Sequence, residues 1–505
     1  MKILLLFAFI LTISFSFAQN SVGIFTNHAD VGNPKIKGTT VYDQATQTYT
    51  IRGAGYNIWF ARDEFQYAYD HISGDFILTA QFEFTGKGVE GHRKIGWMVR
   101  ASEAEDAVHM SATYHGDGLT VMQWRMKKGM EMRDPEDEIR FSKGNAQVIQ
   151  LERSGNVFTM RVAHWGEPLQ EVGSKVLENM PDDVLAGIFI CSHNPDVTEQ
   201  ATVWNVRITK PVKSGYSPYN DGYLASRLET MDITGGKRMV IYESDRGFEA
   251  PNWMPDGQKL LFNQGGSLYE IPVRGGEIVK HNTGGLDHLN NDHDISFDGK
   301  LLAVSHSRPG LKGGGSTVYV LPLSGGTPTM ITPETPSYLH GWASDNKTIY
   351  YVAQRDTTVY NIYKNDIKGS KEVQLTFNRG HHVDGPEGSP DGKYIYFNGS
   401  MTGTMQLWRM KPDGTGLEQL TFDNYNDWFP HVSPDNKWIV FISFPETINP
   451  NDHPAYKKCM LRLMPVSGGA PKVIAYLYGG QGTINVPSWS PDSKHIAFMS
   501  NPGMK

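Results

Sequence analysis

Six similar turns in the second half of the chain are preceded by side chains suited to chemistry. The turns are centred on Asp256, Asp298, Asp345, Asp391, Asp435 and Asp492. Polar and ionisable residues recur four to seven positions before them, where a purely structural strand favours Val, Ile or small residues. Imidazole and carboxylate groups can bind a metal ion, and amides and aromatic rings can hold a hydroxyl-rich ligand. Seven positions before the turns stand Glu249, Asn291, Tyr338, Asp384, Trp428 and Asn485.

Two interpretations of this pattern involve a ligand. In the first, His293, His340 and His431 bind a divalent metal ion such as Mn, Ca or Zn, with Asp384 or Glu387 as a further ligand. In the second, the region binds a sugar or peptide without chemistry. The residues predicted to contact that ligand are Glu249, Asn291, Asp384, Glu387, Trp428, Asn485 and Arg308. A third interpretation is that polar residues at a channel mouth are merely hydrated.

Catalysis is an open alternative. The candidate catalytic residues are His293, His340, Tyr338 and Arg355. Arg308 and Arg355 follow inner strands, and the guanidinium fork suits planar anions such as carboxylate or sulfate. The sequence contains no HExxH, GxSxG or CxxC motif, so neither a metalloprotease nor an α/β-hydrolase nucleophile is indicated.

The turns divide this part of the chain into β-rich units. Their aspartates are 42, 47, 46, 44 and 57 residues apart, and a Gly-rich turn follows each of the first five. Short aromatic and β-branched runs between the turns predict four strands in each period, as in a β-propeller blade. The sixth unit lacks its second turn, which stands instead at Gly235 and Gly236. We therefore predict six blades, the last one combining strands from Asn485–Ser500 with strands from Ser226–Glu243.

The repeats resemble those of TolB-type propellers. Trp253–Gly257 reads WMPDG and Trp489–Ser493 reads WSPDS, each before an apolar strand. The resemblance covers roughly residues 215–505 and implies a WD40-like six-bladed propeller over 224–505. It implies little about function, because related propellers include protein scaffolds, peptidases and polysaccharide lyases. The 57-residue spacing reflects an insert over 444–458, which we expect to border the mouth of the channel.

Residues 20–210 show no such repeat and alternate between apolar and polar positions, which predicts an all-β sandwich. Gly74–Ala80 and Gly96–Arg100 resemble the concanavalin-like jelly rolls often appended to carbohydrate-active proteins. The aromatic rings of this region are expected mainly to fill the sandwich core, as large aromatic side chains usually do. The segment Trp59–Tyr69 is interrupted by charged residues and is therefore the better candidate for exposed rings that stack on sugars. A Pro- and Gly-containing linker over 211–223 joins the two domains.

The N-terminal segment, the net charge and the cysteines indicate where the protein is located and which partners are excluded. Residues 1–18 have the pattern of a secretory signal, with cleavage predicted after Ala18, and this implies a periplasmic or secreted protein without a membrane span. The net charge of -7 argues against a nucleic-acid partner. Cys191 and Cys459 lie in apolar runs and are predicted to be buried free thiols.

These features favour an exported polysaccharide-binding or accessory protein that takes part in polysaccharide degradation. The combination of a sandwich with a TolB-like propeller resembles accessory proteins of polysaccharide-utilisation systems, including those for acidic algal polymers such as ulvan. One alternative is a metal-dependent lyase for uronate-containing oligosaccharides, and if the chain is an enzyme, a polysaccharide lyase or glycoside hydrolase is expected. Another is an envelope scaffold of TolB type that binds protein partners.

Overall fold

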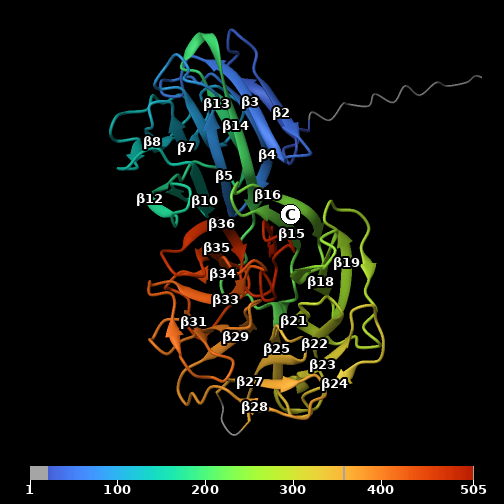
Figure 1. Ribbon diagram of the computed structural model, residues 1–505. Helices are drawn as coiled ribbons and strands as arrows, with labels where there is room; N and C mark the ends of the chain where they lie inside the picture. Colours follow the sequence, from blue (N-terminus) through green and yellow to red (C-terminus); the bar gives the residue numbers. More distant parts are fainter. Residues whose placement is uncertain (1–20, 356–358, 504–505) are drawn as a thin grey trace, which may run out of the picture.

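The computed structural model describes residues 21–355 and 359–503, apart from the side chain of Tyr219. The predicted signal segment lies outside these residues. The described chain is almost entirely β-structure and forms two lobes (Figure 1), with one short α-helix, α1 (Pro218–Asp221), in the connection between them. Among the described residues, no helix has the length and apolar character that crossing a bilayer requires.

The first lobe contains two seven-stranded antiparallel sheets. The first sheet has the order β1 (Asn27–Val31), β4 (Phe65–Ser73), β13 (Asp183–Cys191), β6 (Lys94–Arg100), β7 (His109–His115), β8 (Thr120–Arg125) and β9 (Glu138–Arg140). The second has the order β12 (Gln170–Val176), β11 (Val157–Ala163), β10 (Val148–Ser154), β5 (Phe76–Phe84), β14 (Asn194–Thr209), β3 (Thr48–Gly55) and β2 (Thr39–Asp43). Apolar residues from both sheets, including Trp97 and Leu151, form one core between them. The likeness to concanavalin-like jelly rolls stays a prediction.

Most rings of the Trp59–Tyr69 segment belong to the core, as expected for aromatic residues of the sandwich, and the candidate exposure of this segment is wrong for them. Phe65, Tyr67 and Tyr69 are buried, and the Tyr67 hydroxyl donates to backbone carbonyls of two neighbouring strands. The charged residues that suggested exposure include Asp63, which is itself fully buried between Arg100 and Arg125 at 2.7 and 2.6 Å. A carboxylate paired in this way adds no solvent-facing surface, so the sequence pattern was misleading.

The second lobe is a six-bladed propeller. Five blades are four-stranded sheets that together contain β17 to β36. Within each blade the four strands lie side by side in chain order, starting with the strand at the centre of the ring. The first two are β17 (Glu249–Trp253), β18 (Lys259–Gln264), β19 (Ser267–Pro272), β20 (Val279–Lys280), and β21 (Leu289–Ile295), β22 (Leu301–His306), β23 (Thr317–Pro322), β24 (Thr329–Met330). The next two are β25 (Ser337–Trp342), β26 (Thr348–Ala353), β27 (Asn361–Asp366), β28 (Val373–Gln374), and β29 (Val383–Gly388), β30 (Ile395–Gly399), β31 (Gln406–Met410), β32 (Glu418–Gln419). The fifth is β33 (Asn426–Val432), β34 (Trp438–Phe444), β35 (Lys457–Pro465), β36 (Lys472–Gly479), and a short 3-10 helix, η1 (Lys312–Gly315), interrupts the second.

The sixth blade closes the ring as the repeat pattern predicts. β15 (Ser226–Asp232) pairs on one side with β16 (Arg238–Ser244) and on the other with β37 (His495–Ser500). An isolated bridge between Trp489 and Ile496 adds the innermost segment. Figure 1 shows the C-terminus beside β15 and β16, so the two ends of the propeller meet within one sheet. This closure pairs the sheet edges that an open array would expose.

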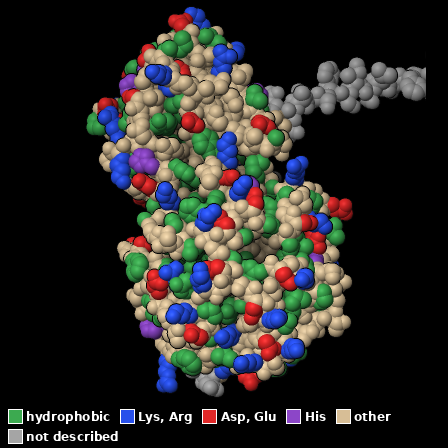
Figure 2. Space-filling model, viewed as in Figure 1, with side chains coloured by type: hydrophobic (Ala, Val, Ile, Leu, Met, Phe, Trp, Pro, Cys, Tyr) green, Lys and Arg blue, Asp and Glu red, His purple; other side chains and the backbone are tan. Residues whose placement is uncertain are grey.

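The closing blade also contacts the sandwich. Glu229 on β15 is fully buried and pairs with Arg207 of β14 at 2.6 Å and with Arg238 of β16. The Gln47 side chain exchanges two 2.8 Å hydrogen bonds with the backbone of Val240. Separating a buried ion pair leaves uncompensated charge, which costs free energy. These contacts therefore hold the two lobes in one arrangement. Over the face in Figure 2, acidic and basic side chains are interspersed.

Both cysteines match their predicted state. Cys191 in the sandwich and Cys459 in the fifth blade are buried free thiols. Burial in apolar surroundings raises the pKa of the Cys191 thiol to about 11 and that of Cys459 to about 12. At neutral pH both are protonated and therefore poor nucleophiles.

Candidate functional site at the mouth of the propeller

A β-bulge in the inner strand of each four-stranded blade decides which side chains reach the channel. In β17 the pairing register with β18 shifts between Glu249 and Asn252, and equivalent shifts occur in β21, β25, β29 and β33. Two bulge residues, Ala250 and Phe429, have left-handed φ values of 56° and 54°. Bulges re-aim side chains that simple alternation would place on the opposite face. Here the residues before the bulge, such as Glu249, form an upper layer, and the residues after it, such as Asn252, form a lower layer.

The upper layer opens into a pocket of about 650 Å³ at the mouth of the ring. Of the six residues that stand seven positions before the turns, all but Trp428 line it. They are Glu249, Asn291, Tyr338, Asp384 and Asn485. His340 joins them, together with the rings of Phe248, Tyr360 and Phe429. The predicted convergence of polar groups from separate blades is therefore present in the structure.

The insert over 444–458 borders this pocket, as predicted. Asn451 and His453 both line it. The His453 ring stands edge-on to Trp428, with centroids 4.4 Å apart, and Trp428 is fully buried. The prediction that Trp428 contacts the ligand is therefore wrong in this arrangement, because the insert covers the indole.

Asp384 is surrounded by three imidazoles. Its carboxylate lies 2.8 Å from His340 Nε2, 3.5 Å from His382 Nε2 and 3.9 Å from His453 Nε2. The nearby imidazoles, His340 first, hold the pKa of Asp384 well below its usual range although burial opposes this, and the pKa of His340 is raised, chiefly by Asp384. At neutral pH the pair is therefore ionic, with the His340 imidazolium beside the Asp384 carboxylate.

Two further carboxyl groups at the mouth have raised pKa values, in contrast to the lowered pKa of Asp384. Burial raises the pKa of Glu249 to about 7 and that of Asp292 to about 6. The Asn291 amide works against the shift at Glu249, while the charge of Asp292 adds to it. A carboxyl group that titrates near neutral pH can take or give a proton, which is what a general acid or base requires.

One ring nitrogen at the mouth, His340 Nδ1, is buried and has no hydrogen-bond partner among the described residues. The other two imidazoles have polar neighbours, since His382 Nε2 lies 3.5 Å from Asp384 and the side chain of Gln481 hydrogen-bonds to His453. Unpaired buried polar atoms are costly, and in native proteins they call for an explanation such as a bound water or ligand. His453 was missed as a site residue by the sequence pattern because it lies in the insert, and only the irregular repeat spacing pointed to it.

The lower layer joins neighbouring blades instead of facing the channel. His431 Nδ1 lies 2.5 Å from Glu387 Oε2, and its Nε2 lies 2.6 Å from the Ile484 carbonyl oxygen. The backbone amide of Val432 donates to Glu387 Oε1 at 3.2 Å. Asn252 likewise donates to the Pro487 carbonyl across the closing seam at 2.5 Å. Glu387 and His431 are thus committed to contacts between blades and do not line the pocket.

The predicted three-histidine metal site does not form in this arrangement. His293 is buried, its Nδ1 faces the Asn291 carbonyl at 3.1 Å, and burial lowers its pKa to about 3. His431 is held by Glu387 and Ile484, while His340 faces Asp384. Among the described residues, the ring nitrogens of His293, His340 and His431 do not gather within 4.8 Å of one another. His293 and His340 stand five positions before their turns and His431 stands four, and the bulges turn these positions toward different neighbours.

The two arginines predicted to contact an anion are engaged elsewhere. Arg308 donates to Thr317 Oγ1 at 2.9 Å and to the Pro333 carbonyl at 2.7 Å. Arg355 pairs with Glu372 at 2.7 Å and approaches Glu334 at 3.5 Å. Neither side chain lines the mouth pocket, so a role for Arg308 or Arg355 at that pocket is not supported by the geometry.

Comparison with known proteins identifies the fold family. No family model matches the chain. The uncharacterised protein Atu1656 of Agrobacterium fabrum is 43% identical over 279 residues, which are 55% of this chain and 93% of that protein. A solved structure provisionally described as TolB from Agrobacterium tumefaciens is 42% identical, covers 55% of this chain and 99% of its own, and has a TM-score of 0.52. The chain belongs to the TolB-like family of six-bladed β-propellers.

The TolB-like relatives match little more than half of the chain. The Tol-Pal system protein TolB of Francisella tularensis is 23% identical over 288 residues, which are 55% of this chain and 62% of that protein. The chain therefore covers less than two thirds of the length of that TolB protein.

Proposed function

We propose that this chain is an exported accessory protein of polysaccharide degradation and that its TolB-like propeller binds an oligosaccharide at the channel mouth. The observation that carries the proposal is the composition of the 650 Å³ pocket. Amides from separate blades, such as Asn263, Asn291 and Asn485, line it beside the rings of Tyr338 and Tyr360. Amides pair with sugar hydroxyls and aromatic faces stack on pyranose rings, so this lining suits a short glycan.

Imidazoles at the mouth favour an acidic glycan. His340, His382 and His453 all line the pocket, and the buried His340 Nδ1 has no hydrogen-bond partner among the described residues. A ring N–H can donate to the carboxylate of a uronate or to a sulfate ester, the groups found in acidic algal polymers such as ulvan. The sandwich supplies a further candidate for sugar stacking. Tyr56 and Phe60 are about two-fifths exposed and stack with their centroids 5.9 Å apart.

The direct test is titration calorimetry of the full chain with oligosaccharides from uronate-containing and sulfated polymers. We expect His382→Ala to weaken binding at least about tenfold, because it removes a donor from a partly dehydrated site. His495→Ala is the matched control, since it removes a propeller imidazole that does not line the pocket. Equal affinities in all three proteins would overturn binding at the mouth.

The same samples separate binding from cleavage. A lyase produces an unsaturated uronate, whose ultraviolet absorbance grows with time, whereas a binding protein leaves the glycan intact. Glu249 is the observation that keeps the lyase as a candidate, because its pKa of about 7 suits a base that removes the proton α to a carboxylate. Absorbance that appears with the wild type and is lost in Glu249→Gln would replace the accessory role with catalysis.

A protein partner at the mouth is a second candidate. It is favoured by the relationship to TolB, whose name places it in the Tol-Pal system. Purified envelope proteins of that system can be titrated against the chain and against His382→Ala. Binding that the variant weakens, with silence toward every glycan, would establish a TolB-type scaffold in place of the glycan-binding role.

A further inference from the structure

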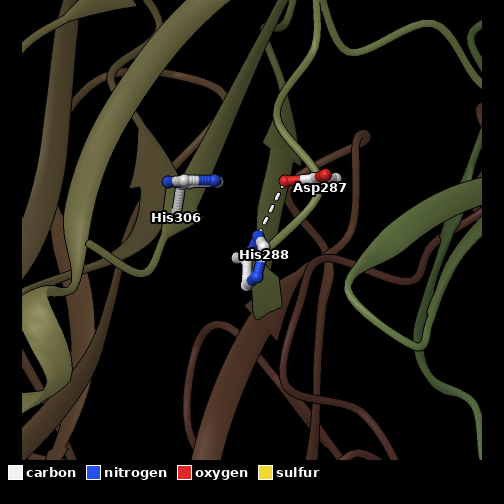
Figure 3. A group of neighbouring side chains, drawn as sticks. All are labelled: Asp287, His288 and His306. Atoms are coloured by element: carbon white, nitrogen blue, oxygen red, sulfur yellow. Dashed lines mark hydrogen bonds and ion pairs between the residues drawn. The ribbon is translucent and has the colours of Figure 1, made fainter. Parts of the chain in front are cut away.

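We propose that Asp287, His288 and His306 form a binding site for a divalent transition metal ion of the Zn²⁺ class on the rim of the second blade. One potential ligand atom from each side chain lies within 4.8 Å of the other two. Figure 3 shows the three side chains around a common space, with a ring nitrogen of His306 on the side that faces Asp287. No other group of three such residues in the described chain meets this condition.

The backbone fixes the two histidines relative to each other. His306 is the last residue of β22 and pairs in register with Leu289, the residue after His288. The Ser307 amide donates to the His288 carbonyl at 2.9 Å, which ties the two positions directly. The Leu289 amide also donates to the Gly266 carbonyl of the preceding blade at 3.0 Å. The imidazoles therefore need little ordering to meet one ion, which lowers the entropic cost of binding.

The three side chains place potential metal-ligand atoms around that space. His288 Nδ1 lies 2.7 Å from Asp287 Oδ1, and the rings of His288 and His306 stand edge to face with centroids 5.9 Å apart. His306 Nδ1 is buried and has no hydrogen-bond partner among the described residues. That orphan nitrogen is the second observation that points to a ligand. A bound ion would satisfy it where the fold does not.

The donor set selects the class of ion. Two imidazoles and one carboxylate suit Zn²⁺ and its neighbours, whereas Ca²⁺ and Mg²⁺ prefer six or more oxygen ligands. Asp287 and His288 are largely exposed, so a bound ion keeps coordination positions open to solvent. Leu289, Asn290 and Ser307 line the mouth pocket, which places the proposed site beside the pocket but outside it. It shares no residue with the cluster around Asp384.

The test uses the full chain after chelator treatment, titrated with ZnCl₂ by calorimetry and with CoCl₂ by visible absorption. We expect His306→Ala and His288→Ala each to lose the ion or weaken it by at least about tenfold, and Asp287→Asn to weaken it similarly. His306→Gln retains most of the side-chain volume and should fail in the same way. Circular dichroism and thermal unfolding in the absence of metal verify that each variant is folded.

Two matched controls make the result specific. His71 forms an exposed pair with Asp183 at 3.2 Å without a third ligand, so His71→Ala should bind metal like the wild type. His382→Ala tests the imidazoles of the mouth and should also retain the ion. The proposal is overturned if His306→Ala binds as many ions as tightly as the wild type, or if His382→Ala alone loses the ion.

Discussion

Two buried pairs of histidine and carboxylate stand on neighbouring blades and differ in how completely their atoms are paired. In the lower pair both His431 nitrogens and both Glu387 oxygens have partners within the protein. In the upper pair His340 Nε2 meets Asp384 at 2.8 Å, but His340 Nδ1 has no partner and both residues line the pocket. Both pairs are more than nine-tenths buried. Polarity and burial are alike in the two pairs, so the upper pair is distinguished by an unpaired ring nitrogen together with a place in the pocket lining.

The largest expected effect is on stability, from breaking the lower pair. His431→Ala leaves the Glu387 carboxylate buried without its imidazole and the Ile484 carbonyl without a donor. We expect the free energy of unfolding to fall by about 3 kcal/mol or more. Urea denaturation followed by tryptophan fluorescence measures the change.

His340→Ala is the matched variant in the upper pair. Asp384 keeps His382 and His453 within 4 Å, and the pocket admits water to its remaining oxygen. We expect a loss of about 1 to 2 kcal/mol, smaller than in His431→Ala. Equal losses in the two variants would remove the distinction between a structural pair and a site pair.

The second expected effect is a pH dependence of the free energy of unfolding, caused by Glu249 at the mouth of the propeller. The folded state holds the pKa of Glu249 at about 7, against an ordinary value of 4.5. Because the folded pKa is raised, the stabilising contribution is complete below about pH 4.5 and is lost as the pH rises through about 7. One unit of pKa shift corresponds to about 1.4 kcal/mol, and partial exposure reduces it, so the total is on the order of 2 kcal/mol.

Glu249→Gln removes the titrating carboxyl group and so isolates its contribution to the pH dependence of stability. The wild type should lose stability relative to the variant between pH 5 and pH 8, measured as the difference in midpoint of thermal or urea unfolding. Glu418→Gln, which removes a surface carboxylate paired with Arg409, should follow the wild type at each pH. Parallel curves for wild type and Glu249→Gln would show that Glu249 titrates at its ordinary pKa.

The sequence predicts the ring and most of its mouth, because both follow from a repeat. The Asp-centred turns recur at blade spacing, and the missing Gly-rich turn predicts the pairing of β15 with β37. Aligning the repeats on the turns also finds five residues that line the pocket. Counting back from a turn works for the residues seven positions before it, because the inner strands lead into their turns in the same way.

The same counting fails for residues between the bulge and the turn. A register shift inverts which side of a strand each residue faces, and no repeated residue type announces it, since Ala250, Gly385 and Phe429 occupy equivalent positions with φ values of 56°, 61° and 54°. Glu387 and His431 were therefore assigned to a ligand although they join blades. The burial of Asp63 shows a related limit, because its partners Arg100 and Arg125 are distant in sequence.

The smallest expected effect on stability comes from His453, which faces the upper pair from the insert. It approaches Asp384 only at 3.9 Å, and its side chain is about one-quarter exposed. We expect His453→Ala to change the free energy of unfolding by less than about 1 kcal/mol and yet to weaken oligosaccharide binding severalfold. Glu446→Gln, at an exposed position of the same insert outside the pocket lining, should leave affinity unchanged. A His453→Ala protein that binds normally would mean that the insert covers Trp428 without contributing to the site, and the comparison would then rest on His340 and His382 alone.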